Sequence, residues 1–243
     1  MKIITWNCAM CFREKIDHVL PLNADILVIP ECESPAKWKG KDKVKGIHDF
    51  LWEDDRYNFN KGLGVFSMNS SFHIERYDPV NEDFRYIVPY KVTGKENFIL
   101  LAVWAQRAST RYESYIGQVF HAIEYYKDLF KQPCIIVGDW NSNQKFDYIK
   151  RVGNHTTVVN MLQTDEIESG YHHFFNEEHG METKPTHYFW RKKERPFHLD
   201  YLFASRSFLE RMKHFEVGRY EDWIKLSDHM PVIAEFDVWR KRT

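Results

Sequence analysis

The sequence predicts an α+β protein in which two packed β-sheets are covered on the outside by helices. Strand-like segments outnumber helical segments along the 243 residues, and the helices are interspersed among the strands. The apolar runs at residues 26–29 and 134–137 are continuous rather than alternating, which is typical of strands buried on both faces. Because no Pro-, Ser- or Gly-rich linker divides the chain, we expect a single domain over residues 1–243.

The first half of the chain contains most of the predicted strands. Residues 2–6 predict a strand that ends at Asn7, and apolar side chains at helical spacing predict a helix over residues 12–22. The strand at 26–29 is expected to stop at Pro30. The polar and aromatic stretch 34–61 gives no clear prediction. Further strands, expected to be antiparallel, are predicted at residues 62–67, 72–76, 84–92 and 97–103.

The second half begins with an amphipathic helix. Five of six positions along one face of residues 113–130 are apolar, so this helix should pack on a sheet. The buried strand that begins at Cys134 follows it and should end at Gly138. The remaining predictions are helices at 146–163 and 207–213, strands at 198–204, 214–217 and 232–238, and a polar loop at 165–185.

Composition and charge exclude several classes of protein. A net charge of −1 gives no overall positive field that would draw the chain to nucleic acid or to membranes, although a local basic surface is still open at residues 191–195 and 240–242. No apolar run approaches the roughly 20 residues that span a bilayer. The four cysteines lie in or beside apolar segments, and no signal peptide is evident, so we expect a reduced, cytoplasmic protein. Cys8 and Cys11 form a CxxC, but without a second such pair core packing is favoured over zinc binding.

Polar side chains stand at the ends of the predicted strands. Asp139 and Asn141 follow the strand that begins at Cys134, although an isolated GDxN sequence is equally compatible with an ordinary Asp/Asn turn. An unpaired carboxylate buried at a strand end would cost several kcal/mol, so these groups should share a site or a metal. The set consists of Asn7, Glu31, Asp139, Asn141, Asp200, Asp228 and His229.

The motifs that contain these residues resemble those of the endonuclease/exonuclease/phosphatase superfamily, also called DNase I-like. They occur in the family order across nearly the whole chain. They are TWN at 5–7, IPE at 29–31, GLGVFS at 62–67, GDWN at 138–141, HLDYLF at 198–203 and SDHMPV at 227–232. The resemblance implies a four-layer α/β/β/α sandwich of two mostly antiparallel sheets flanked by helices.

The resemblance also implies a role for each residue. Asn7, Glu31 and Asp228 would bind Mg²⁺ or Mn²⁺, which prefer oxygen ligands. Asp139 would position or deprotonate the attacking water, and Asn141 would donate to a phosphate oxygen. His229 would stabilise the phosphate, with Asp200 as the partner of its second ring nitrogen.

The sequence departs from the family pattern at Trp104, where relatives usually carry His or Tyr. An indole has one N–H donor and cannot shuttle a proton, so Trp104 would hold a phosphate oxygen, stack on a base or pack in the core. Arg107 and Arg111 follow and would contact the phosphate or lie on the surface. Trp190, beside a basic segment, and Trp38 suit stacking on bases.

These observations predict a metal-dependent hydrolase, most simply a phosphodiesterase acting on DNA or RNA as an endonuclease or exonuclease. One alternative is a phosphatase or phosphodiesterase acting on a small organic phosphate or a phospholipid head group. The other is a nucleic-acid-binding module that has lost catalysis. We expect nucleic acid as the partner, no obligate protein partner and a monomer.

Overall fold

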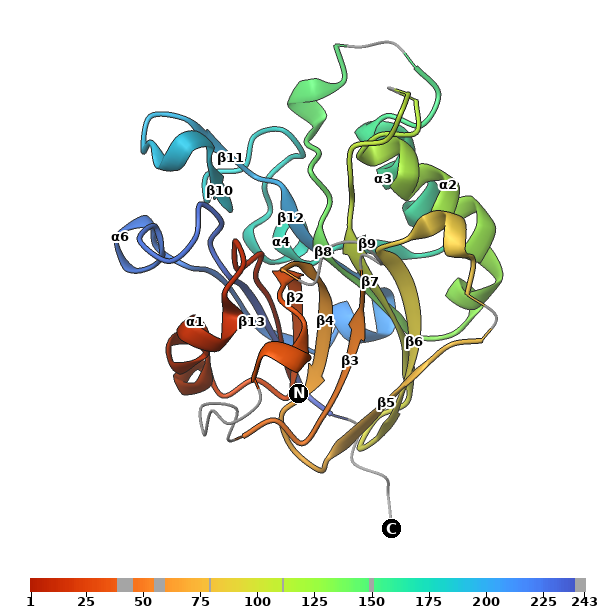
Figure 1. The fold of residues 1–243 in the computed structure, drawn as a ribbon. Helices are drawn as coiled ribbons and strands as arrows, with labels where there is room; N and C mark the ends of the chain where they lie inside the picture. Colours follow the sequence, from red (N-terminus) through yellow and green to blue (C-terminus); the bar gives the residue numbers. More distant parts are fainter. Residues whose placement is uncertain (39–45, 55–59, 79, 111, 149–150, 239–243) are drawn as a thin grey trace.

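Two mixed β-sheets pack face to face in the computed structural model, which describes residues 1–38, 46–54, 60–78, 80–110, 112–148 and 151–238 (Figure 1). In this part of the chain each of the two sheets has six strands. The order in the first is β13 (Met212–Val217), β14 (Val232–Phe236), β1 (Lys2–Thr5), β2 (Ile26–Cys32), β4 (Gly62–Ser67) and β3 (Asp49–Glu53). The order in the second is β5 (Phe72–Arg76), β6 (Ile87–Gly94), β7 (Phe98–Trp104), β8 (Cys134–Asp139), β12 (Asp200–Ser205) and β9 (Ile167–Ser169).

Each sheet contains one parallel pair of neighbouring strands, and the other pairs are antiparallel. β1 runs parallel to β2 in the first sheet, and β7 runs parallel to β8 in the second. β14 is antiparallel to β1, with Thr5 opposite Val232, and β12 is antiparallel to β8, with Asp200 opposite Asp139. The ends of β1, β2 and β8 and the beginnings of β12 and β14 therefore lie at the same edge of the sandwich.

The central strand β8 shows why its apolar run is continuous. Ile135 and Val137 face the core between the two sheets, whereas Cys134 and Ile136 face the core beneath the helices. Because successive strand residues point to opposite faces, both faces of this strand are apolar. Burial of each such aliphatic side chain contributes about 1.5–3 kcal/mol to stability.

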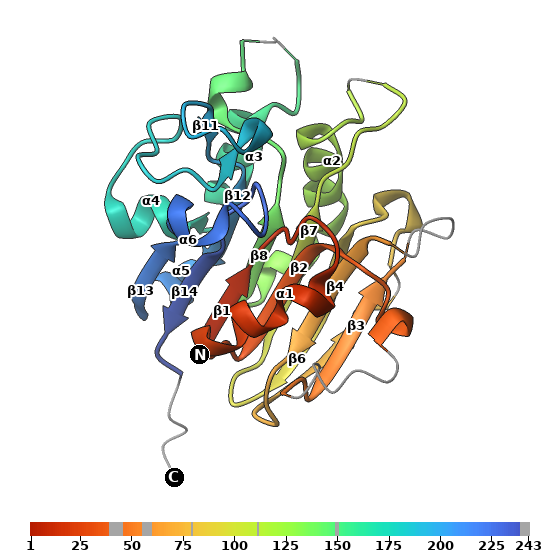
Figure 2. The same ribbon diagram turned by 60° about the vertical axis from the view of Figure 1, so that its left-hand side comes forward.

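Helices cover the outer face of each sheet (Figure 2). α1 (Phe12–Val19) buries one side against the first sheet, and α2 (Ile116–Tyr126) and α3 (His155–Thr164) pack against the second. The layers therefore follow the expected α/β/β/α order. The shorter helices are α4 (Gly170–Phe175), α5 (Arg206–Leu209) and α6 (Tyr220–Trp223), and a two-stranded hairpin consists of β10 (His187–Tyr188) and β11 (Pro196–Phe197).

Several predicted elements begin or end elsewhere. The strand expected from residue 84 starts at Ile87, because Asn81 caps a 3₁₀ turn at Glu82–Phe84 by accepting the N–H of Asp83. The helix expected from residue 146 starts at His155, where the side chain of Asn154 accepts the N–H of Thr157. Both Asn residues are N-caps, a position at which Asn is strongly preferred.

Other segments contain structure that the sequence did not predict. β2 continues through Pro30 to Cys32, with an irregularity between those two residues. The loop expected at 165–185 contains β9 and α4, and the stretch 34–61 contains β3. The prediction that Trp38 stacks on bases is wrong. This side chain is only 6% exposed and packs against Phe12 and Phe66.

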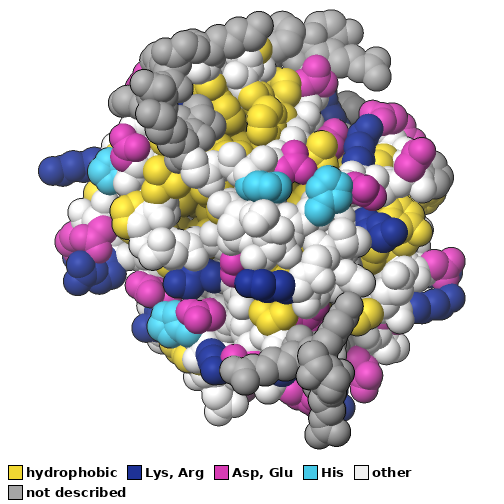
Figure 3. Space-filling view, turned by 90° about the horizontal axis from the view of Figure 1, so that it is seen from below, with side chains coloured by type: hydrophobic (Ala, Val, Ile, Leu, Met, Phe, Trp, Pro, Cys, Tyr) yellow, Lys and Arg dark blue, Asp and Glu magenta, His cyan; other side chains and the backbone are white. Residues whose placement is uncertain are grey.

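The surface at the lower end of the molecule carries both signs of charge. Lys and Arg side chains are interspersed with Asp and Glu side chains on this face (Figure 3). Among the residues that the structure describes, no helix is long and apolar enough to cross a bilayer.

Candidate active site

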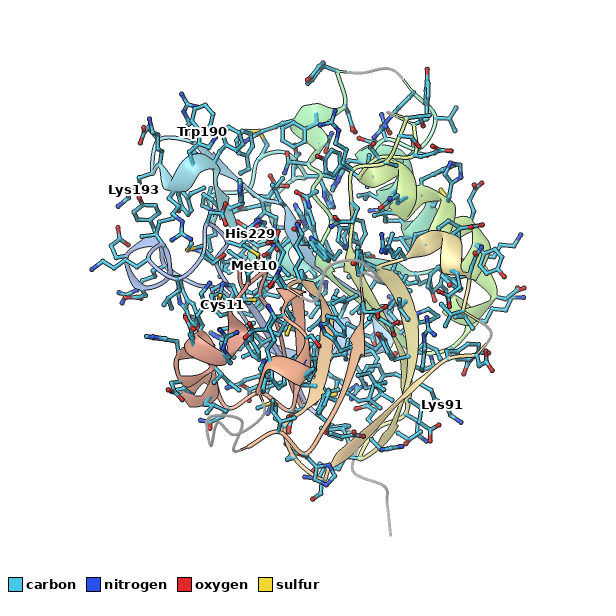
Figure 4. All side chains as sticks on the ribbon, in the orientation of Figure 1. Met10, Cys11, Lys91, Trp190, Lys193 and His229 are labelled. Carbon is cyan, nitrogen blue, oxygen red and sulfur yellow. The ribbon has the colours of Figure 1, made fainter. Side chains whose placement is uncertain are left out.

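Hydrogen bonds to backbone carbonyl oxygens join the three polar segments of the first sheet. The side chain of Ser227 donates to the carbonyl oxygen of Asn7 at 2.7 Å, and the indole of Trp6 donates to that of His229 at 2.9 Å. The N–H of Cys8 donates to the carbonyl oxygen of Pro30 at 3.1 Å. Residues 7, 31 and 227–229 are therefore held at one edge of the sheet, and His229 lies within the molecule where both sheets end (Figure 4).

Glu31 occupies the irregular position in β2. Its φ of 57° is left-handed, a conformation that costs a non-glycine residue about 1–3 kcal/mol. The amide nitrogen of Asn7 lies 3.4 Å from one carboxylate oxygen of Glu31. The bulge thus directs the Glu31 carboxylate toward Asn7 at the shared edge.

The turn that follows Asn7 is also strained. Ala9, Met10 and Cys11 all have positive φ angles, and the side chain of Asn7 accepts the N–H of Ala9 at 3.0 Å. Cys8 is a buried free thiol, and Cys11 is a partly buried one. This turn fixes the orientation of the Asn7 amide.

Asp139 is fully buried at the end of β8 and accepts several hydrogen bonds. Its carboxylate accepts the amide of Asn7 at 3.0 Å, the backbone N–H of Asn141 at 2.9 Å and the amide of Asn141 at 3.0 Å. The Asn141 amide also donates to the carbonyl oxygen of Ala105 at 3.0 Å. In this arrangement Asn141 orients Asp139, whereas the sequence predicted that it would donate to a phosphate.

His229 connects the two sheets through Asp200. Its Nδ1–H donates to Oδ2 of Asp200 at 2.8 Å, and its Nε2 lies 4.0 Å from Oδ2 of Asp139. Burial alone would lower the pKa of His229, but the carboxylates of Asp200 and Asp139 raise it to about 10. Burial raises the pKa of Asp139 to about 7. The two carboxylates therefore favour the imidazolium form of His229, whereas burial favours the protonated form of Asp139.

His187 is a neighbour of this site that the sequence did not single out. Its Nε2 lies 3.7 Å from Oδ2 of Asp228, and its ring centroid lies 4.5 Å from that of His229. Burial alone would raise the pKa of Asp228, but His187 and His229 lower it to about 2. His187 belongs to a two-residue strand, and no periodic pattern distinguishes it from the other histidines, so only the pairing of β10 with residue 229 reveals it.

The residues predicted to contact substrate have different environments. Trp104 is 2% exposed, lies beside Asp139 in the parallel register, and packs on Tyr86 with 4.7 Å between ring centroids, which favours a packing role. Arg107 is exposed and lines a cavity of about 430 Å³ next to Asn141. Arg111 lies outside the described residues.

Trp190 projects from the hairpin formed by β10 and β11 (Figure 4). It is 65% exposed, stacks on Phe189 and has the guanidinium of Arg195 4.5 Å from its ring centroid. Arg191 is also exposed, and its guanidinium donates to the carbonyl oxygens of Ile224 and Lys225. The hairpin is attached beside the site through the pairing of His187 with His229.

The site as a whole contains more acidic groups than cationic groups. Single ligand atoms of Asp139, Asp200 and His229 lie within 4.8 Å of one another, and Glu31 and Asp228 add two further carboxylates. Oxygen-rich sites of this kind suit a hard divalent cation. The arrangement can hold a water molecule, exchange its proton and donate a hydrogen bond to an anionic substrate.

Comparison with known proteins identifies the family and the fold. The Endonuclease/Exonuclease/phosphatase family profile matches residues 4–229. No curated protein sequence gives a significant match. One solved structure with the same fold is a 3'-5' exonuclease (NExo) from Neisseria meningitidis. It has 20% sequence identity and a TM-score of 0.72, and the match covers 98% of this chain and 100% of that one.

Two other solved structures are similar to a comparable degree. The 3' phosphatase NExo from Neisseria, bound to a product DNA hairpin, has 19% identity and a TM-score of 0.71, and the match covers 98% of this chain and 99% of that one. An AP endonuclease from Archaeoglobus fulgidus has 19% identity and a TM-score of 0.68, over 98% and 100% of the two chains. At these identities the structures establish the fold, and the profile match over most of the sequence establishes that the chain belongs to the endonuclease/exonuclease/phosphatase family.

Proposed function

We propose that this chain is a divalent-metal-dependent phosphodiesterase that hydrolyses P–O ester bonds in nucleic acid. The observation that carries the proposal is the buried arrangement of Asp139, His229 and Asp200, with His229 2.8 Å from Asp200 and 4.0 Å from Asp139. A purely structural ion pair would not require a second buried carboxylate on the other side of the imidazole.

The residues present fit a Mg²⁺ or Mn²⁺ ion held by Asn7, Glu31 and Asp228. Glu31 and Asp228 supply carboxylate oxygens at an edge where acidic groups exceed cationic ones, and Asn7 lies within hydrogen-bond distance of Glu31. Such ions take one or two carboxylates and keep several waters for exchange with substrate oxygens. When bound, the ion would neutralise negative charge on the phosphoryl group and on the leaving oxygen.

The side chains themselves perform the proton transfer and the positioning. Asp139 accepts the proton of a water whose oxygen bonds to phosphorus, while the ester P–O bond on the opposite side breaks. His229 donates a hydrogen bond from Nε2 to a non-bridging phosphate oxygen, and Asp200 fixes the ring through Nδ1. Asn141 orients Asp139 through two hydrogen bonds. General acid–base help of this kind is worth about 10²–10⁴ in rate.

The hairpin beside the site supports nucleic acid as the substrate. Trp190 and Phe189 are exposed aromatic side chains, and Arg195 adds a positive charge beside the indole. Stacking of a base on such a ring is worth about 1–3 kcal/mol and does not depend on sequence. The DNA hairpin bound to the Neisseria structure is consistent with this choice.

A second candidate is hydrolysis of a small organic phosphate or a phospholipid head group. It is favoured by the cavity of about 430 Å³ beside Asn141, which is lined by Arg107, Ser109 and Thr110. Such a cavity is large enough for a small phosphate ester, with Arg107 available to its anionic end.

The test compares the two substrate classes on the same protein. Supercoiled plasmid, single-stranded DNA, RNA, inositol phosphates and a chromogenic phosphodiester are incubated with Mg²⁺ or Mn²⁺, with and without EDTA. We expect cleavage of nucleic acid that EDTA stops and that Asp139→Asn or His229→Ala abolishes. Asp17→Asn and His18→Ala, at exposed positions on α1, serve as controls that should remain active.

Two outcomes would contradict the proposal. Cleavage of only the small esters would favour the second candidate. Binding of nucleic acid with steep salt dependence and no cleavage of any substrate would identify a binding module without catalysis.

A further inference from the structure

A second cluster of ligand-type side chains lies on α4 and the loop that follows it, outside the active site. One ligand atom each of His172, His179 and Glu182 lies within 4.8 Å of the other two. The two imidazole rings stack with 3.5 Å between centroids, and Oε1 of Glu182 lies 3.3 Å from Nε2 of His172. The Glu182 side chain is 1% exposed, so a carboxylate is held here almost entirely away from water.

Two further buried imidazoles border this cluster. The ring of His155 lies 5.7 Å from that of His179, and the ring of His198 lies 6.4 Å from that of His172. Nδ1–H of His198 donates to the carbonyl oxygen of Lys184 at 2.8 Å, which leaves the lone pair on Nε2.

Several ring nitrogens of this group have no hydrogen-bond partner. Within the described residues, Nε2 of His155, Nδ1 of His179 and Nε2 of His198 are buried without one. An unsatisfied buried polar atom costs about 1–3 kcal/mol, and the cost recurs here at neighbouring side chains. In a purely structural polar cluster, hydrogen bonds would satisfy these nitrogens. In a cation-binding cluster, ring nitrogens keep a lone pair that can bind the ion.

Hydrogen bonds from neighbouring groups hold the side chains of this cluster in place. Nδ1 of His172 is 2.7 Å from the hydroxyl of Ser169, and Glu182 accepts the N–H of Gly180 at 2.9 Å and the amide of Asn143 at 3.1 Å. These contacts fix the orientation of the ligand side chains. A cavity of about 530 Å³ lined by His172 and His179 gives access from solvent.

We propose that His172, His179 and Glu182 form a binding site for a borderline-soft divalent cation, with Zn²⁺ as the preferred ion. Two imidazoles and one carboxylate are a ligand set that Zn²⁺ takes with a water molecule in the fourth position. Mg²⁺ and Ca²⁺ prefer oxygen ligands, so nitrogen-rich coordination selects against them. This site is separate from the Glu31 edge and does not depend on the proposed catalytic activity.

Asn143 connects the cluster to the active site. Its amide contacts Glu182, the carbonyl oxygen of His198 and the hydroxyl of Tyr201, and it lies two residues beyond Asn141. An ion that fixes Glu182 would therefore also fix the segment that follows Asn141. The role of the site is to stabilise the structure, so metal content and melting temperature are its direct readouts.

The test measures Zn²⁺ binding by the full chain after metal is removed with EDTA and the chelator is dialysed away. Calorimetric titration with Zn²⁺ and metal analysis after desalting should give one ion per chain. Zn²⁺ at about 100 times its Kd should raise the melting temperature by about 5–11 °C. His172→Ala and His179→Ala should each weaken binding at least about 100-fold and remove this rise. His173→Ala, at the exposed neighbouring position of α4, should bind as the wild type does.

A second measurement covers variants that fail to fold. Wild-type protein loaded with Co²⁺ should show the intense visible absorption of four-coordinate cobalt, and added Zn²⁺ should abolish it. Glu31→Gln and Asp139→Asn should retain the signal. The proposal is overturned if wild-type protein binds no Zn²⁺, or if His172→Ala and His179→Ala bind it as tightly as the wild type. It is also overturned if the signal is lost in Glu31→Gln, which would place the ion at the catalytic edge.

Discussion

Replacement of Gly138 by Ala should damage both the fold and the site, because Gly138 combines a positive φ with close contact to β7. Its φ is +144°, and a Cβ at this position would lie 1.8 Å from the carbonyl oxygen of Val103 and 3.0 Å from the Val103 backbone nitrogen. Both atoms belong to backbone, so no side chain can move aside. Relief requires β7 and β8 to separate or the backbone at Gly138 to rotate.

The expected loss of folding stability in Gly138→Ala has two separate contributions. A disfavoured φ costs about 1–3 kcal/mol, and overpacking costs about 1–3 kcal/mol more. For a chain of this size 1 kcal/mol shifts the melting temperature by about 2–4 °C, so a decrease of about 4–24 °C is expected. Because Asp139 is the next residue, a displacement of about 1 Å should also lower kcat about 100-fold.

The matched control is Gly46→Ala. Gly46 has a φ of +111°, but its added Cβ would meet only a side-chain atom of Leu20 at 3.4 Å, which is close to ordinary contact. This variant isolates the cost of φ from the cost of the clash. Thermal melting and steady-state cleavage are measured for both variants. Equal melting temperatures for the two, together with unchanged kcat for Gly138→Ala, would refute the reasoning.

Three further changes test the site. Asp200→Asn removes the negative charge that stabilises the imidazolium of His229, so kcat for cleavage should fall about 10²–10⁴-fold with little change in KM. A kcat within threefold of the wild-type value would contradict this role of Asp200. Trp190→Ala should raise KM for single-stranded DNA roughly 5- to 150-fold, because about 1–3 kcal/mol of stacking is lost. The KM for a chromogenic phosphodiester should not change, and equal effects on both substrates would exclude stacking. Glu31→Gln should raise the Mg²⁺ concentration for half-maximal cleavage at least about tenfold, and an unchanged requirement would move the ion to other ligands.

The sequence predicted the parts of the site that lie at the ends of regular strands. Asp139 and Asp200 follow or begin continuous apolar runs, and such runs are the strongest local signal of a buried strand. The fold follows from the same signal, because β4 and β5 occupy the predicted residues 62–67 and 72–76.

The remaining features depend on contacts that local sequence does not encode. His187 reaches the site through pairing with residue 229, and Trp38 is buried by side chains from distant strands. The polar stretch that contains His172 and His179 reads as a loop because its elements are only a few residues long. The hydrogen bond from the Asn141 amide to Asp139 is a tertiary contact of the same kind.

The residues of the candidate active site come from both sheets, so the distance between the two sheets sets the distances between these side chains. Side-chain contacts such as Asn7 to Asp139 and His229 to Asp200 join the two sheets across that gap. A change in the volume of the intervening core, at Val28 or Leu100 for instance, alters the spacing at which donor and acceptor meet. Residues that never approach a substrate can therefore set the rate, and tolerated core substitutions should occur in volume-compensating combinations.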